Sequence, residues 1–286
     1  MRTPSVVWSL QLLRYVLSVP LTPSAPRLRY ETTGPEAAPR VLLVMGYGMR
    51  GRVWQPQIDG LGEDHRLAWF DARGIGDSDR PPGPWSMADM ARDASRVLDA
   101  LGWNERVHLV GVSMGGMVAQ HLALAEPERL STLTLIATTP GGVLSKLPTL
   151  RGIYYFARAN LASQATRRDV LVKLLYPDAF VRSTDPEALA RRMEQQMGVR
   201  ASPSTLRAQL AAVTLHDVRS RLAEIELPTL VVRPGRDLLM RPTNSDRLAR
   251  DIPNARLLEL PEAGHGVVFQ CSDEVNRALR EHFRRP

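Results

Sequence analysis

The chain has 286 residues, of which 44% are hydrophobic and 23% are charged, and its formal net charge is +7. These proportions are typical of a globular protein with a substantial core, and they exclude a disordered or low-complexity chain. A single cysteine, Cys271, excludes an internal disulfide framework and offers no cysteine cluster for a metal. This cysteine usage fits a reducing compartment, so we expect the protein in the cytoplasm.

Residues 1–26 form an N-terminal extension that differs from the rest of the chain. A positive start, an apolar middle and a Pro-Ser-Ala sequence near the end are typical of an export signal, but Arg14 interrupts the apolar run. The uninterrupted apolar stretch is too short to span a bilayer, so we predict no stable membrane insertion. An export signal, an unusual N-terminal strand or helix, and a start codon placed too early all stay open.

From Leu28 onward, strand-like and helix-like segments alternate. We predict strands over 28–32, 40–44 and 66–70, and helices over 53–61 and 87–101. The loop after the third strand, 71–79, has the sequence Asp-Ala-Arg-Gly-Ile-Gly-Asp-Ser-Asp. In it we expect Asp71 and Arg73 to hold a sharp turn and to take no part in catalysis. Strands separated by helices predict a mostly parallel sheet with helices on both faces.

The segment 106–120 runs from an apolar strand through Gly111-Val112-Ser113-Met114-Gly115 into a helix. Only glycine avoids steric clashes at the positions around so tight a strand-to-helix turn. The turn lifts the Ser113 hydroxyl clear of the sheet. Because a hydroxyl is a weak nucleophile at neutral pH, this geometry predicts a base and an orienting acid nearby.

Two later segments supply such groups. A buried-type strand at 227–236 leads to Asp237, and a strand at 255–261 leads to Glu262-Ala-Gly-His265-Gly266. Earlier in the chain, a strand at 41–44 is followed by the glycine-rich turn Met45-Gly46-Tyr47-Gly48. The order of the candidate groups is therefore serine, aspartate, histidine.

This set of motifs resembles the α/β-hydrolase fold family, over roughly Leu28 to the C-terminus. The family orders its catalytic residues as nucleophile, acid and histidine. The resemblance implies that Ser113 is the nucleophile, His265 the base and Asp237 the acid that orients it. It implies no metal and no organic cofactor.

The resemblance also implies an oxyanion hole formed by the backbone N–H groups of Tyr47 and Met114. Met45 stands where the family usually has the histidine of a His-Gly pair. Because the donors are backbone N–H groups, the replacement of this histidine side chain need not abolish the oxyanion hole.

The alternation breaks between 141 and 222, where we predict helices and no strand. The helices are expected over 150–162, 166–175, 186–197 and 204–213. We therefore predict an α/β-hydrolase core from 27–140 and 223–286 with an inserted helical cap over 141–222. The side chains of five cap residues could line a substrate pocket or form the core of the cap. These are Tyr154, Tyr155, Phe156, Met193 and Met197.

The expected cap contains 13 Lys and Arg against 6 Asp and Glu. The surplus could steer anionic substrates toward the cap, or it could be an ordinary solvated helix face. No motif indicates nucleic-acid binding.

A serine at the elbow argues against the haloalkane-dehalogenase and epoxide-hydrolase branches of the family, which need a carboxylate nucleophile. The predicted activity is therefore that of a serine hydrolase that cleaves a carboxylic ester through an acyl-serine intermediate, with a small-molecule ester or lactone as substrate. Hydrolysis of a lactone, an enol-lactone or a carbon–carbon bond, and cofactor-free perhydrolysis, stay open. A ligand-binding member of the fold without catalysis is a further alternative, and the oligomeric state is left open.

Overall fold

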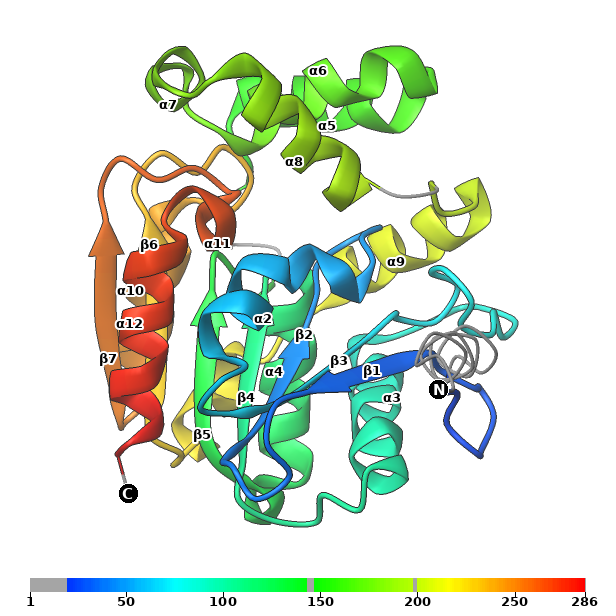
Figure 1. Cartoon of the computed structure of the whole chain (residues 1–286), viewed down its shortest axis with the longest axis vertical. Coiled ribbons are helices and arrows are strands. Elements are labelled where there is room, and N and C mark those ends of the chain that lie inside the picture. The colour runs from blue at the N-terminus through cyan, green and yellow to red at the C-terminus, as the bar shows by residue number, and fades with distance from the viewer. Residues whose placement is uncertain (1–19, 143–146, 198–199, 286) are drawn as a thin grey trace, which may run out of the picture.

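A seven-stranded sheet forms the centre of the computed structural model, which describes residues 20–142, 147–197 and 200–285 (Figure 1). In spatial order the strands are β1 (Tyr30–Thr33), β3 (Arg66–Phe70), β2 (Arg40–Val44), β4 (Val107–Val112), β5 (Leu130–Ile136), β6 (Thr229–Pro234) and β7 (Ala255–Leu260). Only β1 runs antiparallel to its neighbour, β3, and the other pairs are parallel. The prediction of a mostly parallel sheet is therefore confirmed. Residues 1–19, which hold most of the predicted N-terminal extension, lie outside the described residues.

The sheet is buried on both faces, and alternate residues of each central strand enter different cores. In β2, Leu42 and Val44 belong to one apolar cluster, while Val41 and Leu43 belong to the other. The first cluster includes residues of α3 (Met87–Ala100), α4 (Met114–Ala125) and α10 (Pro242–Asp251). The second includes residues of α2 (Gln55–Leu61) and α12 (Ser272–Phe283). Helices thus cover both faces, as predicted.

Several element boundaries differ from the sequence prediction. The segment 53–61 is a 3₁₀ turn, η1 (Gly51–Trp54), followed by α2, and β1 begins at Tyr30 rather than at 28. The helices α7 (Asp178–Ser183) and α10 were not predicted. The first is only 6 residues long, and the second has Leu248 as its only buried apolar residue. The remaining short elements are η2 (Pro127–Arg129), η3 (Arg219–Glu224) and α11 (Val267–Gln270).

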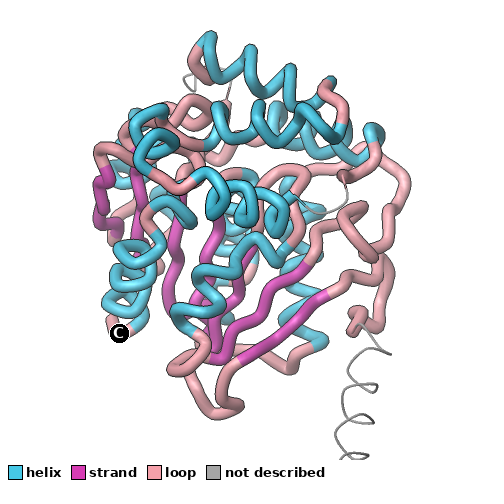
Figure 2. Tube along the Cα trace, turned by 45° about the horizontal axis from the view of Figure 1, so that its top comes forward, coloured by secondary structure: helices cyan, strands magenta, loops and turns pink. Residues whose placement is uncertain are grey.

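Four helices lie above the edge of the sheet where the parallel strands end, and we call them the cap helices (Figures 1 and 2). They are α5 (Leu150–Leu161), α6 (Gln164–Leu175), α7 and α8 (Pro186–Met197), and an apolar cluster of their own joins α5, α6 and α8. The next helix, α9 (Pro203–Leu215), differs, because its Ala212 belongs to a cluster on the sheet. We therefore propose that the cap domain predicted over 141–222 has α5 to α8 as its independent part.

None of the helices in the described ranges combines the length and the apolar character that a membrane span requires.

The loop after β3 is held by hydrogen bonds to the elements around it. The Asp71 carboxylate accepts from the Gly51 N–H at 2.8 Å, and the Ser78 hydroxyl donates to the Asp71 carbonyl at 2.7 Å. Arg73 donates through Nε and Nη2 to the two carboxylate oxygens of Asp93 on α3, at 2.6 and 2.8 Å. Arg73 is 6% and Asp93 1% exposed. This buried ion pair ties the loop to α3, and it agrees with the structural role predicted for the loop.

Replacing Arg73 with leucine should destabilise the protein by up to about 3–5 kcal/mol, because the buried Asp93 carboxylate would lose its bidentate partner and keep only the ion pair with Arg96 at 3.0 Å. Urea unfolding monitored by circular dichroism would measure this loss. The matched control is Arg92→Leu on the exposed face of α3, where the partner is Asp89 and the expected loss is about 0–1 kcal/mol. Equal losses in the two variants would contradict the assignment.

Candidate active site

Ser113 sits on a tight turn between β4 and α4. Its backbone torsion angles are φ 56° and ψ −122°, a conformation that residues with a Cβ atom rarely adopt. Hydrogen bonds hold both of its backbone groups, because its N–H donates to the Ile136 carbonyl at 2.9 Å and its carbonyl accepts from the Thr138 hydroxyl at 2.7 Å. The strained turn is therefore fixed from the neighbouring strand β5 and the loop that follows it.

The glycines on either side of Ser113 allow the backbone to pack at this turn. A Cβ atom on Gly111 would lie 2.3 Å from the Gly115 carbonyl oxygen. A Cβ atom on Gly115 would lie 2.1 Å from the carbonyl oxygen of Val44, the last residue of β2. Both distances are far shorter than a van der Waals contact, so no other residue type fits the observed backbone.

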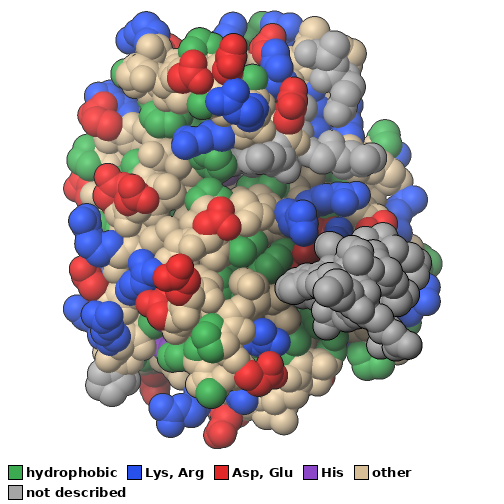
Figure 3. Space-filling model, in the orientation of Figure 1, with side chains coloured by type: hydrophobic (Ala, Val, Ile, Leu, Met, Phe, Trp, Pro, Cys, Tyr) green, Lys and Arg blue, Asp and Glu red, His purple; other side chains and the backbone are tan. Residues whose placement is uncertain are grey.

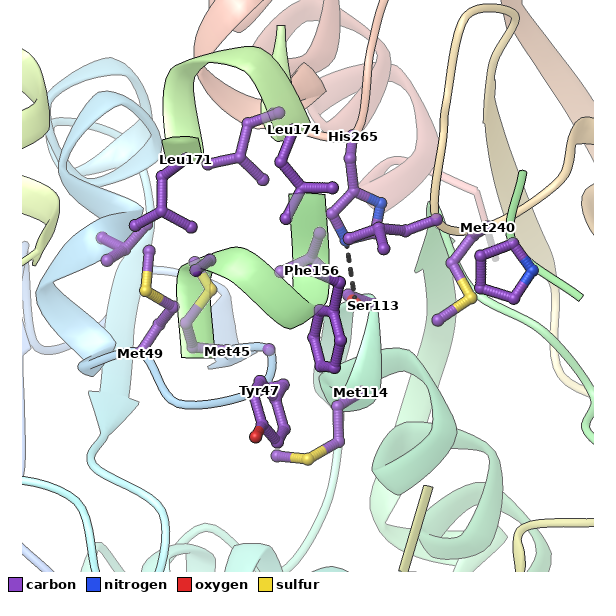
Figure 4. Close-up of a pocket in the computed structure, with 18 of the residues that line it drawn as sticks. Met45, Tyr47, Met49, Ser113, Met114, Phe156, Leu171, Leu174, Met240 and His265 are labelled. Carbon is purple, nitrogen blue, oxygen red and sulfur yellow. Dashed lines mark hydrogen bonds between the residues drawn. The ribbon is translucent and has the colours of Figure 1, made fainter. Parts of the chain in front are cut away.

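Asp237 and His265 approach Ser113 from loops that follow β6 and β7. His265 Nε2 lies 3.0 Å from Ser113 Oγ, and His265 Nδ1 lies 2.7 Å from Asp237 Oδ2. Figure 4 shows the bond between histidine and serine (Figure 4). The other carboxylate oxygen of Asp237 accepts from the N–H groups of Leu239 and Met240 at 2.7 and 2.9 Å. The structure thus brings together the three residues that the sequence places up to 152 positions apart.

The two predicted oxyanion donors lie beside the serine. Tyr47 belongs to the turn after β2, and a Cβ atom on its neighbour Gly46 would be 3.6 Å from Ser113 Oγ. Met114 is the first residue of α4, whose N-terminus carries a partial positive charge. Among the described residues, neither amide N–H donates a turn, loop or cap hydrogen bond. Both are therefore available to an oxygen at the serine.

A cavity of about 270 Å³ opens above Ser113 and His265. The side chains of Phe156, Leu171 and Leu174 line it from the cap helices (Figure 4). Leu210 and Val213 of α9 complete the wall, and several methionines from the core side add flexible apolar surface. These are Met45, Met49, Met114 and Met240.

The sequence had left open whether five cap side chains line a pocket or form the core of the cap. Phe156 lines the cavity and also packs against the cap cluster, as Tyr155 does, whereas Met193 is fully buried in that cluster. Tyr154 is exposed to solvent. The side chain of Met197 lies outside the described residues.

Three polar side chains in the cavity wall were not predicted to act there. The Tyr47 hydroxyl bonds to the Asn160 side-chain oxygen at 3.1 Å, and burial raises the pKa of Tyr47 to about 12, so the phenol is neutral. Arg167, on α6, also lines the cavity. Burial, together with the nearby Arg200, lowers the pKa of the Arg167 guanidinium. Helical period alone could not single out Arg167, because its neighbour Arg168 looks equivalent in the sequence.

Other reactive side chains are less suited to catalysis. Burial raises the pKa of Cys271 to about 11, so its thiol is protonated at neutral pH. Burial lowers the pKa of His108, His216 and His282 to about 4, so these rings are neutral. Within the described ranges, no group of three or more His, Cys, Asp or Glu side chains could hold a metal ion.

Comparison with known proteins agrees with this fold. The family described as alpha/beta hydrolase fold matches residues 39–270, and the chain belongs to this family of hydrolases. Among curated relatives, "Putative carbamate hydrolase RutD" of Azorhizobium caulinodans is 32% identical over 255 residues, which cover 88% of this chain and 93% of that protein. The relatedness therefore extends over nearly the whole chain.

Solved structures give the same result. A hydrolase from Pseudomonas aeruginosa PA01 is 26% identical with a TM-score of 0.79, over 94% of this chain and 99% of that one. A thermophilic esterase from Thermogutta terrifontis is also 26% identical, with a TM-score of 0.75 over 92% of this chain and 96% of that one. The resemblance inferred from the sequence motifs is therefore confirmed.

Replacing Gly115 with alanine should abolish hydrolytic activity, because the added methyl group would push α4 away from the end of β2 and separate Ser113 and the Met114 amide from the turn that holds Tyr47. A steady-state hydrolysis assay on the purified variant checks this. The control is Gly102→Ala, where the methyl group would meet no atom within 4 Å. The free energy of unfolding of that variant should fall by only roughly 1–2 kcal/mol, the cost of an alanine in the left-handed conformation, and its activity should be kept. Full activity in Gly115→Ala would show that the close approach is not required.

Proposed function

We propose that this hydrolase is a carboxylesterase that works through an acyl-serine intermediate, with Ser113, His265 and Asp237 as its catalytic residues. The observation that carries the proposal is the continuous hydrogen-bonded chain from Asp237 through His265 to Ser113 at the floor of an apolar cavity. An acid, a base and a nucleophile in hydrogen-bond contact are the requirement for activating a serine hydroxyl.

The proposed reaction begins with proton transfer. Because the Asp237 carboxylate accepts only, the hydrogen bond of 2.7 Å places the imidazole proton on Nδ1 and leaves the lone pair of Nε2 toward Ser113 Oγ. His265 then takes the serine proton as Oγ attacks the carbonyl carbon of the ester. Asp237 stabilises the resulting imidazolium and keeps the ring oriented.

The negative charge of the tetrahedral intermediate falls on the former carbonyl oxygen. The amides of Tyr47 and Met114 would donate to it, with the positive end of α4 adding to the attraction. Collapse of the intermediate breaks the bond to the alkoxy oxygen, which leaves as an alcohol with the proton from His265. Water, activated by the same histidine, then hydrolyses the acyl-serine and restores the hydroxyl.

The apolar cavity wall supports an ester whose acyl group carries several carbons. A lactone could react by the same steps, with the leaving hydroxyl still attached to the acyl chain. Hydrolysis of a carbamate is a second candidate function, which the name of the relative at 32% identity favours. The rate of p-nitrophenol release from matched p-nitrophenyl esters and carbamates would discriminate between these substrate classes.

Ser113→Ala should reduce esterase turnover by several orders of magnitude, on the order of 10⁶ in a fully developed triad, because the nucleophile is lost. Release of p-nitrophenol from a short p-nitrophenyl ester measures the effect, and circular dichroism checks the fold. Near-native turnover in the purified variant would overturn the assignment of the nucleophile.

Asp237→Asn should reduce kcat by about 10⁴ with little change in KM, because asparagine can donate to Nδ1 and favour the wrong imidazole tautomer. The matched control is Asp246→Asn on α10, which removes the same charge from a carboxylate that pairs with Arg233 away from the triad. Comparable kcat values for Asp237→Asn and Asp246→Asn would rule out an orienting role for Asp237.

A further inference from the structure

Arg167 is a buried cation without a counter-ion. The residue is 6% exposed, it lines the cavity above Ser113, and its buried Nη1 has no hydrogen-bond partner among the described residues. All 30 Asp and Glu of the chain lie within the described ranges, and none forms an ion pair with Arg167. A buried guanidinium is normally paired, because the loss of hydration must be offset by an acceptor.

Three exposed arginines of the cap have carboxylate partners. Arg151 pairs with Asp178, Arg168 with Asp169, and Arg191 with Glu187. On the face shown in Figure 3, acidic and basic side chains lie interspersed over the cap helices (Figure 3). Other surface arginines, Arg158, Arg182 and Arg207, have no ion pair among the described residues, but water solvates them. Arg167 differs from all of these because it is buried and faces the cavity.

The surroundings of Arg167 add positive potential and no negative charge. The Arg200 guanidinium lies close enough to lower the pKa of Arg167, and it donates only to the neutral carbonyl oxygens of Asn160 and Ala162. Arg167 also stands in the first turn of α6, which holds no acidic residue, so the helix dipole repels it. The nearby Tyr47 hydroxyl is neutral and cannot balance these charges.

Tyr47 connects this region to the site of reaction. Its backbone amide faces the proposed oxyanion position. The centroid of its ring lies 5.3 Å from the centroid of the Phe156 ring, and its hydroxyl donates a hydrogen bond to the side-chain oxygen of Asn160. Arg167 lies near Tyr47 in the same cavity wall. A ligand that extends from Ser113 along the Tyr47 ring would therefore contact apolar side chains before it reaches the Arg167 guanidinium.

We propose that Arg167, supported by Arg200, binds a carboxylate carried by the substrate, so that the natural substrate is an ester or lactone of a dicarboxylic acid. This inference rests on the proposed function for the reaction at Ser113. The carboxylate oxygens would supply the acceptors that the guanidinium lacks, in the charge-assisted geometry that arginine favours. The carbon chain between the two carboxyl groups would lie against the apolar wall.

The test compares p-nitrophenyl monoesters of succinic, glutaric and adipic acid with neutral p-nitrophenyl esters of the same chain lengths. The measured quantity is the ratio of kcat/KM for the acidic ester to that for its neutral counterpart. We expect Arg167→Gln to lower this ratio by about 10- to 100-fold at the best chain length, as for loss of a hydrogen bond to a charged group. Arg168→Gln, which removes the same charge from the next residue of α6, should leave the ratio unchanged.

A binding experiment separates this proposal from the proposed function. In the Ser113→Ala background, glutarate and its homologues should raise the thermal midpoint, and the added Arg167→Gln substitution should abolish that rise. If Ser113→Ala keeps wild-type esterase activity, the proposed function fails, while the thermal shift still tests the carboxylate site. An unchanged ratio together with an unchanged thermal shift in the Arg167→Gln proteins would overturn the proposal.

Misfolding can be distinguished from loss of binding. Because Arg167 is an unpaired buried charge, Arg167→Met should leave the thermal midpoint of the ligand-free protein equal or higher. A methionine variant that keeps this midpoint and loses the glutarate-dependent rise supports a binding role. A large fall of the midpoint without ligand would instead show that Arg167 stabilises the fold, and would overturn the proposal.

Discussion

The structure depends on the close packing of two backbone segments at the end of β2 and the start of α4. Gly115 lies so near the Val44 carbonyl that a methyl group would not fit between them. This contact sets the distance between the turn that carries Tyr47 and the turn that carries Ser113. Because both proposed oxyanion donors and the nucleophile lie on these two turns, their relative positions depend on backbone packing and hardly at all on side-chain rotamers. Such a site is preorganised, since little has to move when charge develops.

The parallel sheet explains how such distant residues meet. Strands β4, β6 and β7 point the same way, so the loops at their carboxyl ends lie along one edge of the sheet. Ser113, Asp237 and His265 each occupy one of these loops. The two amide donors to Asp237 fix its carboxylate, so the histidine is oriented by a group that is itself held in place.

The sequence motifs were sufficient to predict the features that depend on local chemistry. The glycine spacing around Ser113 predicted the elbow, and the strand-loop positions of Asp237 and His265 predicted their meeting. Strand and helix periods predicted the sheet, but not α10, whose only buried apolar residue is Leu248, nor the packing of α9 on the core. The unmatched Arg167 could not be predicted either, because Arg167 and Arg168 are adjacent and chemically identical in the sequence. Which of them faces the cavity is decided only by how α6 packs over the core.

The placement of charge in the cap reverses what stability alone would favour. Arg151, Arg168 and Arg191 are solvated by water and still have carboxylate partners, whereas the buried Arg167 has none. A leucine or methionine in its place would remove the cost of desolvating a charge. An anionic ligand that pairs with Arg167 would remove the same cost, and the stabilisation of the bound protein would grow with the logarithm of the ligand concentration. Binding of the substrate would then stabilise the packing of α6 over Ser113, because the guanidinium that recognises the ligand belongs to that helix.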